Sequence, residues 1–333
     1  MIFHPSILAL YVASVLISFM VLYSAFYGLQ ILRKWDLQSG SEGQLILERK
    51  TYLVSTLLTY FFGFELLSLF LYVFTVDRLH TFFVGAMCAA GSLYVNSYGY
   101  PALILKVINF LLAGLWLILN YTDNRAYDYP LVKKKYLFLL ILTPLILAET
   151  ILQAEYFLRL KPNIITSCCG SLFSTEATGL GFELSSVPGI PMKIVFYLSM
   201  TLTLLSAAYF CMRRKGGYIL SILSAITFFS SVIAIISFIS LYFYELPTHH
   251  CPFCILQKEY GYIGYPIYMT LFGGTIAGMG VGVLMPFRNI KSLSDVVPSV
   301  QRRLAIVSLI LFLLFTAIVT YRMVFSGLSL QGY

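Results

Sequence analysis

Residues 217–245 read GYILSILSAITFFSSVIAIISFISLYFYE and contain no charged side chain before Glu245. A membrane-spanning helix needs about 20 consecutive apolar residues, so this stretch is long enough to cross a bilayer. Inside lipid there is no water to bond the backbone amides and carbonyls, and a single run satisfies them within itself only as a helix. The stretch therefore predicts a membrane-spanning α-helix.

Further apolar runs are distributed along the chain, which is 59% hydrophobic and only 11% charged. A soluble domain of 333 residues could not bury that much apolar surface. The predicted spans are 6–32, 51–76, 102–120, 136–158, 192–212, 217–245, 261–286 and 304–326. The shorter, glycine-containing run 81–98 is either one more span or a re-entrant segment. We therefore predict an all-α, polytopic transmembrane helical bundle with 8–9 spans.

Residues 1–333 are expected to form a single integral membrane domain. It comprises N-terminal helices over 1–135 and, over 136–333, helices that carry two polar loops, 159–191 and 246–260. Basic residues cluster in the other connections, as cytoplasmic loops do. These residues are Arg33, Lys34, Arg49, Lys50, Arg125, Lys133, Lys134, Lys135, Arg213, Arg214, Lys215, Arg288, Lys291, Arg302 and Arg303.

The last of these basic clusters alternate with the two polar loops across single spans, so both polar loops are expected to face outward. A re-entrant 81–98 is favoured because it keeps the basic loop 33–50 inside. The formal net charge of +8 resides largely in these short loops, which excludes nucleic-acid binding as its explanation. The expected surroundings are a lipid bilayer, the bacterial inner (plasma) membrane, with the polar loops extracytoplasmic.

Cysteines are concentrated in the two outward loops. Loop 246–260 carries Cys251 and Cys254 in a Cys-x-x-Cys arrangement, and loop 159–191 carries the adjacent pair Cys168 and Cys169. Disulfides persist in extracytoplasmic compartments, so these pairs are candidate redox centres. The remaining cysteines, Cys88 and Cys211, are expected to be ordinary buried packing residues, because free cysteine behaves as a small hydrophobe.

Prolines flank the Cys-x-x-Cys. Pro247 would end the preceding helix, and Pro252 suits the first turn of the next one. Cys251 is then expected at a helix N-terminus, where the dipole and the unpaired amides stabilise a thiolate. His249 and His250, if protonated, would lower its pKa further.

Residues 251–258, CPFCILQK, resemble the first periplasmic redox motif of the disulfide bond formation protein B family, where Cys-x-x-Cys opens a helix and Ile-Leu-Gln-Arg often follows. The resemblance implies oxidation of a periplasmic dithiol protein and transfer of electrons to a membrane quinone, with Lys258 in the position of the basic residue that helps to hold the quinone. A cysteine pair preceding the Cys-x-x-Cys is similar to the vitamin K epoxide reductase family, which uses the same chemistry on a helical bundle.

We therefore expect a membrane thiol–disulfide oxidoreductase. Cys251, Cys254, Cys168 and Cys169 would be the catalytic thiols and ubiquinone or menaquinone the electron acceptor. Lys258, His249, His250, Tyr262 and Tyr265 would form the quinone site, the tyrosines walling a flat ring. A thioredoxin-like protein or a cytochrome is the expected extracytoplasmic partner.

Two other interpretations remain open. Two adjacent cysteines can form a disulfide with each other only through a strained ring. Thiolates together with a histidine are also suitable ligands for Cu or Zn. The metal ligands would then be Cys168, Cys169, Cys251, Cys254 and His250. A third interpretation is a structural subunit of a respiratory membrane complex, in which the cysteines are simply bridged.

Ionisable residues within the spans are costly and are usually paired or functional. Glu149 is expected to pair with another helix, for example with Arg322, or to relay protons together with Glu155. Glu65, Lys106 and Asn109 lie in other spans.

Glycines repeat every four residues in the span that follows the Cys-x-x-Cys, at Gly274, Gly278 and Gly282. Small residues at this spacing let helices approach closely. They therefore predict a face for helix packing.

Overall fold

A computed structural model describes residues 4–36, 39, 41–162, 164–166 and 189–328. Within these residues the chain is almost entirely helical, and β pairing is confined to one isolated bridge between Val84 and Ile165. Eight helices of the described part are long and apolar enough to cross a membrane. The all-α class is thereby confirmed, and the number of candidate spans in the described residues agrees with the lower of the two predicted counts.

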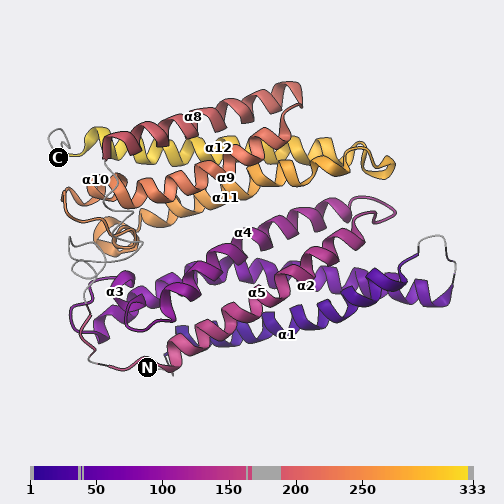
Figure 1. Ribbon diagram of the computed structural model, residues 1–333, viewed down its shortest axis with the longest axis horizontal. Helices are drawn as coiled ribbons and strands as arrows, with labels where there is room; N and C mark the ends of the chain where they lie inside the picture. The colour runs from indigo at the N-terminus through magenta and orange to yellow at the C-terminus, as the bar shows by residue number, and fades with distance from the viewer. Residues whose placement is uncertain (1–3, 37–38, 40, 163, 167–188, 329–333) are drawn as a thin grey trace. The chain divides into compact units, whose positions relative to one another are not determined.

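The helices follow one another along the chain with short connections between most of them (Figure 1). Their bounds are α1 (Pro5–Lys34), α2 (Glu42–Arg78), α3 (Ala89–Leu93), α4 (Gly99–Asp123), α5 (Val132–Leu158), α8 (Gly189–Arg213), α9 (Gly217–Ala234), α10 (Ser240–Tyr244), α11 (Gly264–Val283) and α12 (Val296–Phe325). A π-helical turn, Ile235–Ile239, joins α9 to α10 within one continuous span.

Run 81–98 does not form a long helix. It begins in a 3-10 turn, Leu79–Phe82, and contains only the five-residue helix α3. This excludes a ninth helical span over these residues, while the depth of the segment in a bilayer stays a prediction.

The chain divides into two compact units. The N-terminal unit comprises Met1–Thr75, Asn96–Leu160 and Pro286–Val300, and the C-terminal unit comprises Val76–Val95, Lys161–Met285 and Gln301–Tyr333. The last turn of α2 and the following segment, including α3, thus belong to the C-terminal unit.

In the N-terminal unit, α5 packs against both α1 and α4. Buried side chains of α1, α2, α4 and α5 form one core, in which the rings of Phe62 and Trp116 meet edge to face at a centroid distance of 4.9 Å. Two buried ion pairs tie α4 to α5, Lys106 with Glu149 and Asp123 with Lys135. Lys106 precedes Asp123 in α4, whereas its partner Glu149 follows Lys135 in α5. The two helices are therefore antiparallel.

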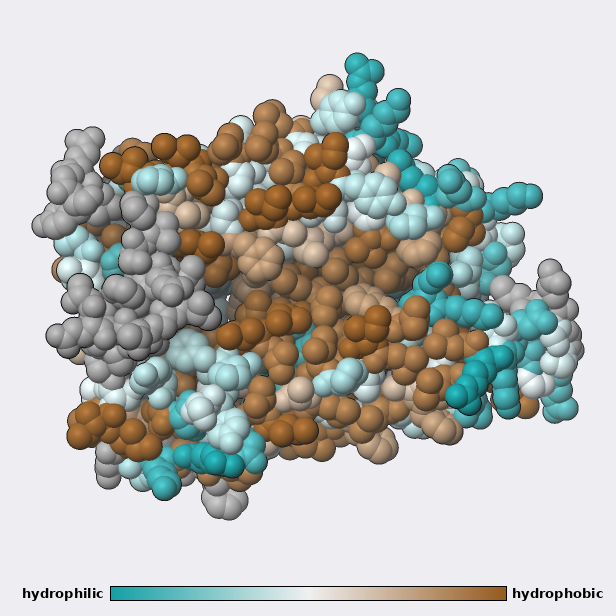
Figure 2. All heavy atoms as spheres, viewed as in Figure 1, coloured by the Kyte–Doolittle hydropathy of each residue, from teal (hydrophilic) through white to brown (hydrophobic). Residues whose placement is uncertain are grey.

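The outer flanks of the helices carry large apolar side chains. Phe19, Phe64 and Leu205 are each more than half exposed. Figure 2 shows hydrophobic side chains along the helices and hydrophilic ones gathered near helix ends. Extended apolar surface of this kind is rare on soluble monomers, and the helices are apolar enough to sit in a lipid bilayer.

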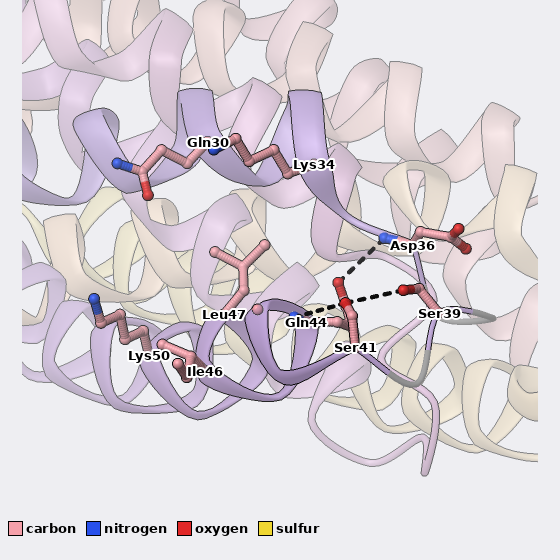
Figure 3. A pocket seen from close by; sticks show the side chains of 10 residues that line it. Gln30, Lys34, Asp36, Ser39, Ser41, Gln44, Ile46, Leu47 and Lys50 are labelled. Carbon is pink, nitrogen blue, oxygen red and sulfur yellow. Dashed lines mark hydrogen bonds between the residues drawn. The ribbon is translucent and has the colours of Figure 1, made fainter.

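A polar pocket lies between the end of α1 and the start of α2 in the N-terminal unit (Figure 3). Lys34, Asp36 and Lys50 are among its lining residues, and the backbone amide of Asp36 donates to Gln44 Oε1 at 3.2 Å. The pocket contains none of the predicted site residues.

In the C-terminal unit, α9 packs against α8 and α11. The glycine face of α11 makes the close approaches that its spacing predicts. A Cβ atom added at Gly282 would lie 2.3 Å from Ser221 Cβ on α9, and one at Gly278 would lie 2.0 Å from Ser224 Oγ.

Replacing Gly282 by alanine is therefore expected to destabilise the protein by about 1–3 kcal/mol, the usual range for overpacking. The loss should appear as a lower unfolding temperature of the full-length protein in detergent. Gly63→Ala in α2 is the matched control, because its added Cβ meets nothing within 4 Å. Equal unfolding temperatures for the two variants would show that α9 and α11 accommodate the added methyl group at little energetic cost.

Candidate metal centre

The Cys-x-x-Cys lies in the irregular connection between α10 and α11. Helix α10 ends at Tyr244, and Glu245 follows in the left-handed region at φ 56°. Cys254–Leu256 form a single 3-10 turn, and α11 begins only at Gly264. The prediction that Cys251 lies at the N-terminus of the next helix is therefore wrong. Gly261 at φ 62° and Tyr262 at φ 58° separate the motif from α11.

Three thiols converge at this connection. Cys251 Sγ lies 3.3 Å from Cys88 Sγ, which comes from the residue just before α3. The sulfur atoms of Cys88, Cys251 and Cys254 all lie within 4.8 Å of one another. None of the three forms a disulfide, and their side chains are buried, with Cys254, the most accessible, only 5% exposed.

Cys88 is the functional candidate that the sequence analysis missed. It is buried, as expected, but its sulfur atom contacts that of Cys251 instead of packing only against apolar side chains. It precedes Cys251 by 163 residues, and no local pattern in the sequence joins the two positions. Only the fold brings them together.

The two histidines occupy different positions. His249 Nε2 lies 3.3 Å from Cys254 Sγ, and its ring packs edge-on against Tyr244 at a centroid distance of 4.4 Å. His250 Nδ1 instead lies 3.0 Å from the carbonyl oxygen of Ile236 in the π-helical turn. A carbonyl oxygen can only accept a hydrogen bond, so Nδ1 carries the proton of a neutral His250. This contact fixes the tautomer. Among the described histidines, His249 is thus the one in contact with a thiol of the cluster.

Hydrogen bonds between tyrosine hydroxyls and the backbone hold the cysteine loop in shape. The hydroxyl of Tyr244 donates to the carbonyl of Cys251 and accepts from the amide of Ile255. Tyr268 Oη donates to the carbonyl of Pro252 at 2.7 Å. Tyrosines of α10 and α11 therefore fix the loop on both sides of the Cys-x-x-Cys.

Asp77 and Gln257 join the cysteine loop to the segment that carries Cys88. Gln257 Nε2 donates to Asp77 Oδ1 at 3.0 Å and to the carbonyl of Met87 at 2.9 Å. Asp77 Oδ1 also accepts from the amide of Ala89 at 3.1 Å. The residues on either side of Cys88 are thereby bonded directly to the connection that follows Cys254.

Burial raises the pKa of the Cys251 thiol well above its usual value, because a thiolate loses its hydration there. The expected helix N-terminus, which would have lowered this pKa, is not present at Cys251. Without a bound cation, Cys251 is therefore a protonated thiol near neutral pH.

In metal-free protein, alkylation of Cys251 is expected to rise with pH at a midpoint above about 8.5, the value of an ordinary cysteine. Folding favours the protonated thiol, so the stability it contributes is present below that ordinary pKa and is lost as pH rises through the folded-state value. Iodoacetamide labelling followed by peptide mass spectrometry gives the midpoint for each cysteine. A Cys251 midpoint below that of a short cysteine peptide would contradict the burial argument.

The other predicted site residues are distributed as follows. Lys258 and Tyr262 are exposed, Tyr265 is half-buried, and the rings of Tyr262 and Tyr265 are 6.3 Å apart. Cys168 and Cys169 lie outside the described residues. A quinone site formed by the tyrosines and Lys258 stays a prediction.

The ionisable residues of the spans pair differently from the example that the sequence suggested. Glu149 pairs with Lys106 at 2.6 Å, whereas Arg322 pairs with Glu245 at 3.1 Å. The expected Glu149–Arg322 pair is therefore wrong. Glu155 forms an exposed ion pair with Arg159 one turn away.

No family model, no curated protein and no solved structure matches this chain.

Proposed function

We propose that this protein is an integral membrane protein that binds a thiophilic metal ion, Zn²⁺ or Cu⁺, through Cys88, Cys251 and Cys254. The observation that carries the proposal is the convergence of three buried thiols from two distant segments. Two sulfur atoms that share one zinc ion at about 2.3 Å lie no more than about 4.6 Å apart. The observed grouping within 4.8 Å approaches that geometry without a rearrangement of the backbone.

The ligand types favour soft cations. Thiolates select Cu⁺ and Zn²⁺ over the hard cations that prefer oxygen ligands. His249 contacts Cys254 but is not part of the group whose ligand atoms all lie within 4.8 Å, so it would have to move toward the other two sulfurs to become a fourth ligand. Three sulfurs and one imidazole make a closed tetrahedral zinc site, whereas three sulfurs alone suit a trigonal Cu⁺. The alternative ligand His250 is engaged with Ile236 instead.

The burial of the thiols also favours a bound cation. A dithiol that exchanges with a soluble protein must expose one sulfur to the attacking thiolate, and Cys251 is fully buried. A metal ion displaces thiol protons and compensates part of the charge of thiolates that would otherwise be buried without a counter-charge. The raised pKa of Cys251 is thus compatible with metal binding and unfavourable for nucleophilic exchange.

The test is a titration of purified full-length protein, in detergent and without oxygen, with Zn²⁺ or Cu⁺ against a chromophoric chelator. We expect one ion per chain, with sulfur ligands visible in X-ray absorption. His249→Ala should weaken Zn²⁺ strongly if the site is tetrahedral and leave Cu⁺ nearly unchanged if it is trigonal. Cys168→Ser/Cys169→Ser should leave the stoichiometry at one. Protein that retains neither ion would refute the proposal.

A second candidate function is the quinone-linked thiol oxidoreductase, and the Cys88–Cys251 sulfur contact is the observation that favours it. Two thiols would become one disulfide, giving two electrons and two protons to a quinone, which becomes a quinol. Cys88, rather than Cys254, could then be the partner of Cys251. Thiol trapping with and without a quinone analogue distinguishes the two candidates, because thiols held by a metal resist oxidation by quinone.

A further inference from the structure

A second buried polar cluster lies in the N-terminal unit, independent of the thiols. It is formed by Glu65 and Ser68 of α2, Lys106 and Asn109 of α4, and Glu149 of α5. All five side chains are at most 4% exposed, and all lie within helices long and apolar enough to cross a membrane. Groups of this kind inside a span are costly and are usually paired or functional.

The hydrogen bonds of the cluster converge on Glu149. Lys106 Nζ donates to Glu149 Oε1 at 2.6 Å, and Asn109 Nδ2 donates to Glu149 Oε2 at 2.6 Å. Lys106 Nζ also donates to Ser68 Oγ at 3.2 Å. The carboxyl group of Glu65 interacts with that of Glu149 and with the Lys106 ammonium. Two carboxyl groups and one ammonium group therefore share one buried site.

The charges of these groups do not balance if both carboxyls ionise. Lys106 compensates one carboxylate, and a second carboxylate in the same apolar site would be an unpaired buried charge. Glu65 lies one turn before Ser68, which accepts from Lys106 Nζ, so an electrically neutral cluster requires one of the two carboxyl groups to keep its proton. Two nearby tyrosines are neutral at ordinary pH: Tyr72, whose ring centroid is 5.5 Å from Lys106 Nζ, and Tyr156, whose ring meets that of Tyr72. Helix α1 contributes the hydroxyl of Ser14 and the carbonyl of Leu10 here, and both accept from Gln153 Nε2.

Unsatisfied acceptors provide an independent sign that something is bound. Asn109 Oδ1 and Gln153 Oε1 are buried without a hydrogen-bond donor among the described residues. Both side chains are fully buried, and Gln153 follows Glu149 by one helical turn. Gln153 Nε2 donates to Ser14 Oγ at 2.8 Å, which leaves its oxygen as the free acceptor. Buried polar atoms are rarely left without a donor, so these oxygens mark positions for a water molecule or a carboxyl O–H.

We propose that Glu65 and Glu149 together hold one exchangeable proton, so that the N-terminal unit contains a proton-binding site inside the membrane span. In the loaded state, one carboxyl O–H, one carboxylate and the Lys106 ammonium sum to zero charge. On release the O–H bond breaks, the proton passes to water, and the cluster carries one net negative charge. The acceptors on Asn109 and Gln153 are where water would receive that proton. A metal cation is disfavoured because the Lys106 ammonium already occupies the carboxylate face.

The test is infrared spectroscopy of the full-length protein, which detects the C=O stretch of a protonated carboxyl group. At neutral pH we expect one such band for the pair, shifted in heavy water. Replacing either carboxyl should remove it, because the remaining carboxylate pairs with Lys106 and ionises. Glu65→Gln and Glu149→Gln are therefore both expected to lose the band. Lys106→Met should double the band area, since neither carboxyl then has a compensating charge.

Glu155→Gln is the matched control, because this carboxylate is exposed and pairs with Arg159; it should leave the band unchanged. Wild-type protein without any protonated-carboxyl band at neutral pH would overturn the proposal. So would a band of full area in both Glu65→Gln and Glu149→Gln. The measurement on wild-type protein requires no variant to fold, and it is independent of the outcome of the metal titration.

Discussion

Replacing Cys88 by serine is expected to weaken metal binding more than about 100-fold, although Cys88 lies 163 residues from the Cys-x-x-Cys. Loss of a group that merely orients a metal ligand typically costs 10–100-fold in affinity, and loss of a ligand itself costs more. A serine hydroxyl is a hard donor that does not ionise near neutral pH, so it cannot replace a thiolate for Cu⁺ or Zn²⁺. Competition with a chromophoric chelator measures the change in Kd.

Cys211→Ser is the control for this experiment. Cys211 is a half-buried cysteine that packs against the core of α8, α9, α11 and α12, and it is absent from the thiol cluster. Its replacement should leave the metal stoichiometry unchanged. If Cys88→Ser bound the ion as tightly as wild-type protein and Cys211→Ser, Cys88 would be a packing residue and the metal proposal would lose its third ligand.

Replacing Lys135 by methionine is expected to destabilise the protein by about 3–5 kcal/mol, because Asp123 would remain as a buried charge without compensation. Lys135 Nζ lies 2.7 Å from Asp123 Oδ2 and donates to Asn120 Oδ1 at 2.9 Å. Both members of the ion pair are at most 1% exposed. The loss should be visible as a lower free energy of unfolding in detergent titrations.

The double replacement Lys135→Met/Asp123→Leu should recover much of this loss, since apolar pairs of similar volume often replace buried ion pairs at little cost. Complete recovery is not expected, because Asp123 Oδ1 also accepts from the amide of Leu131 at 2.8 Å. Lys134→Met, at an exposed neighbouring position, is the matched control and should change stability little. A Lys135 variant as stable as the Lys134 variant would contradict a buried, charge-paired Lys135.

Most of the spans could be predicted from the sequence, because continuous apolar runs in this chain leave helix as the only way to satisfy the backbone. Run 217–245 corresponds to Gly217–Tyr244 within one residue. The ends were less accurate where charged residues continue a helix. Helix α5 begins at Val132 rather than at 136, because Lys135 is buried in an ion pair with Asp123. Hydropathy alone cannot detect such pairing.

The candidate site was predictable only in part. The Cys-x-x-Cys and His249 are visible as a motif, and the structure places His249 against Cys254. The contribution of Cys88 depends on a contact between segments far apart in the chain, for which a single sequence holds no local signal. The helix start was misplaced because Pro252 favoured it, whereas Gly261 in the left-handed region delays it to Gly264.

The assignment of Val76–Val95 to the C-terminal unit has a consequence for biosynthesis. Cys88 is translated long before Cys251 and Cys254. Its thiol therefore leaves the ribosome before the rest of its unit has been synthesised. During that interval it is open to oxidation or to a wrong disulfide partner. A fragment starting at Lys161 would retain Cys251 and Cys254 but lack Cys88, so the later half of the chain alone could not assemble the three-thiol site that we propose.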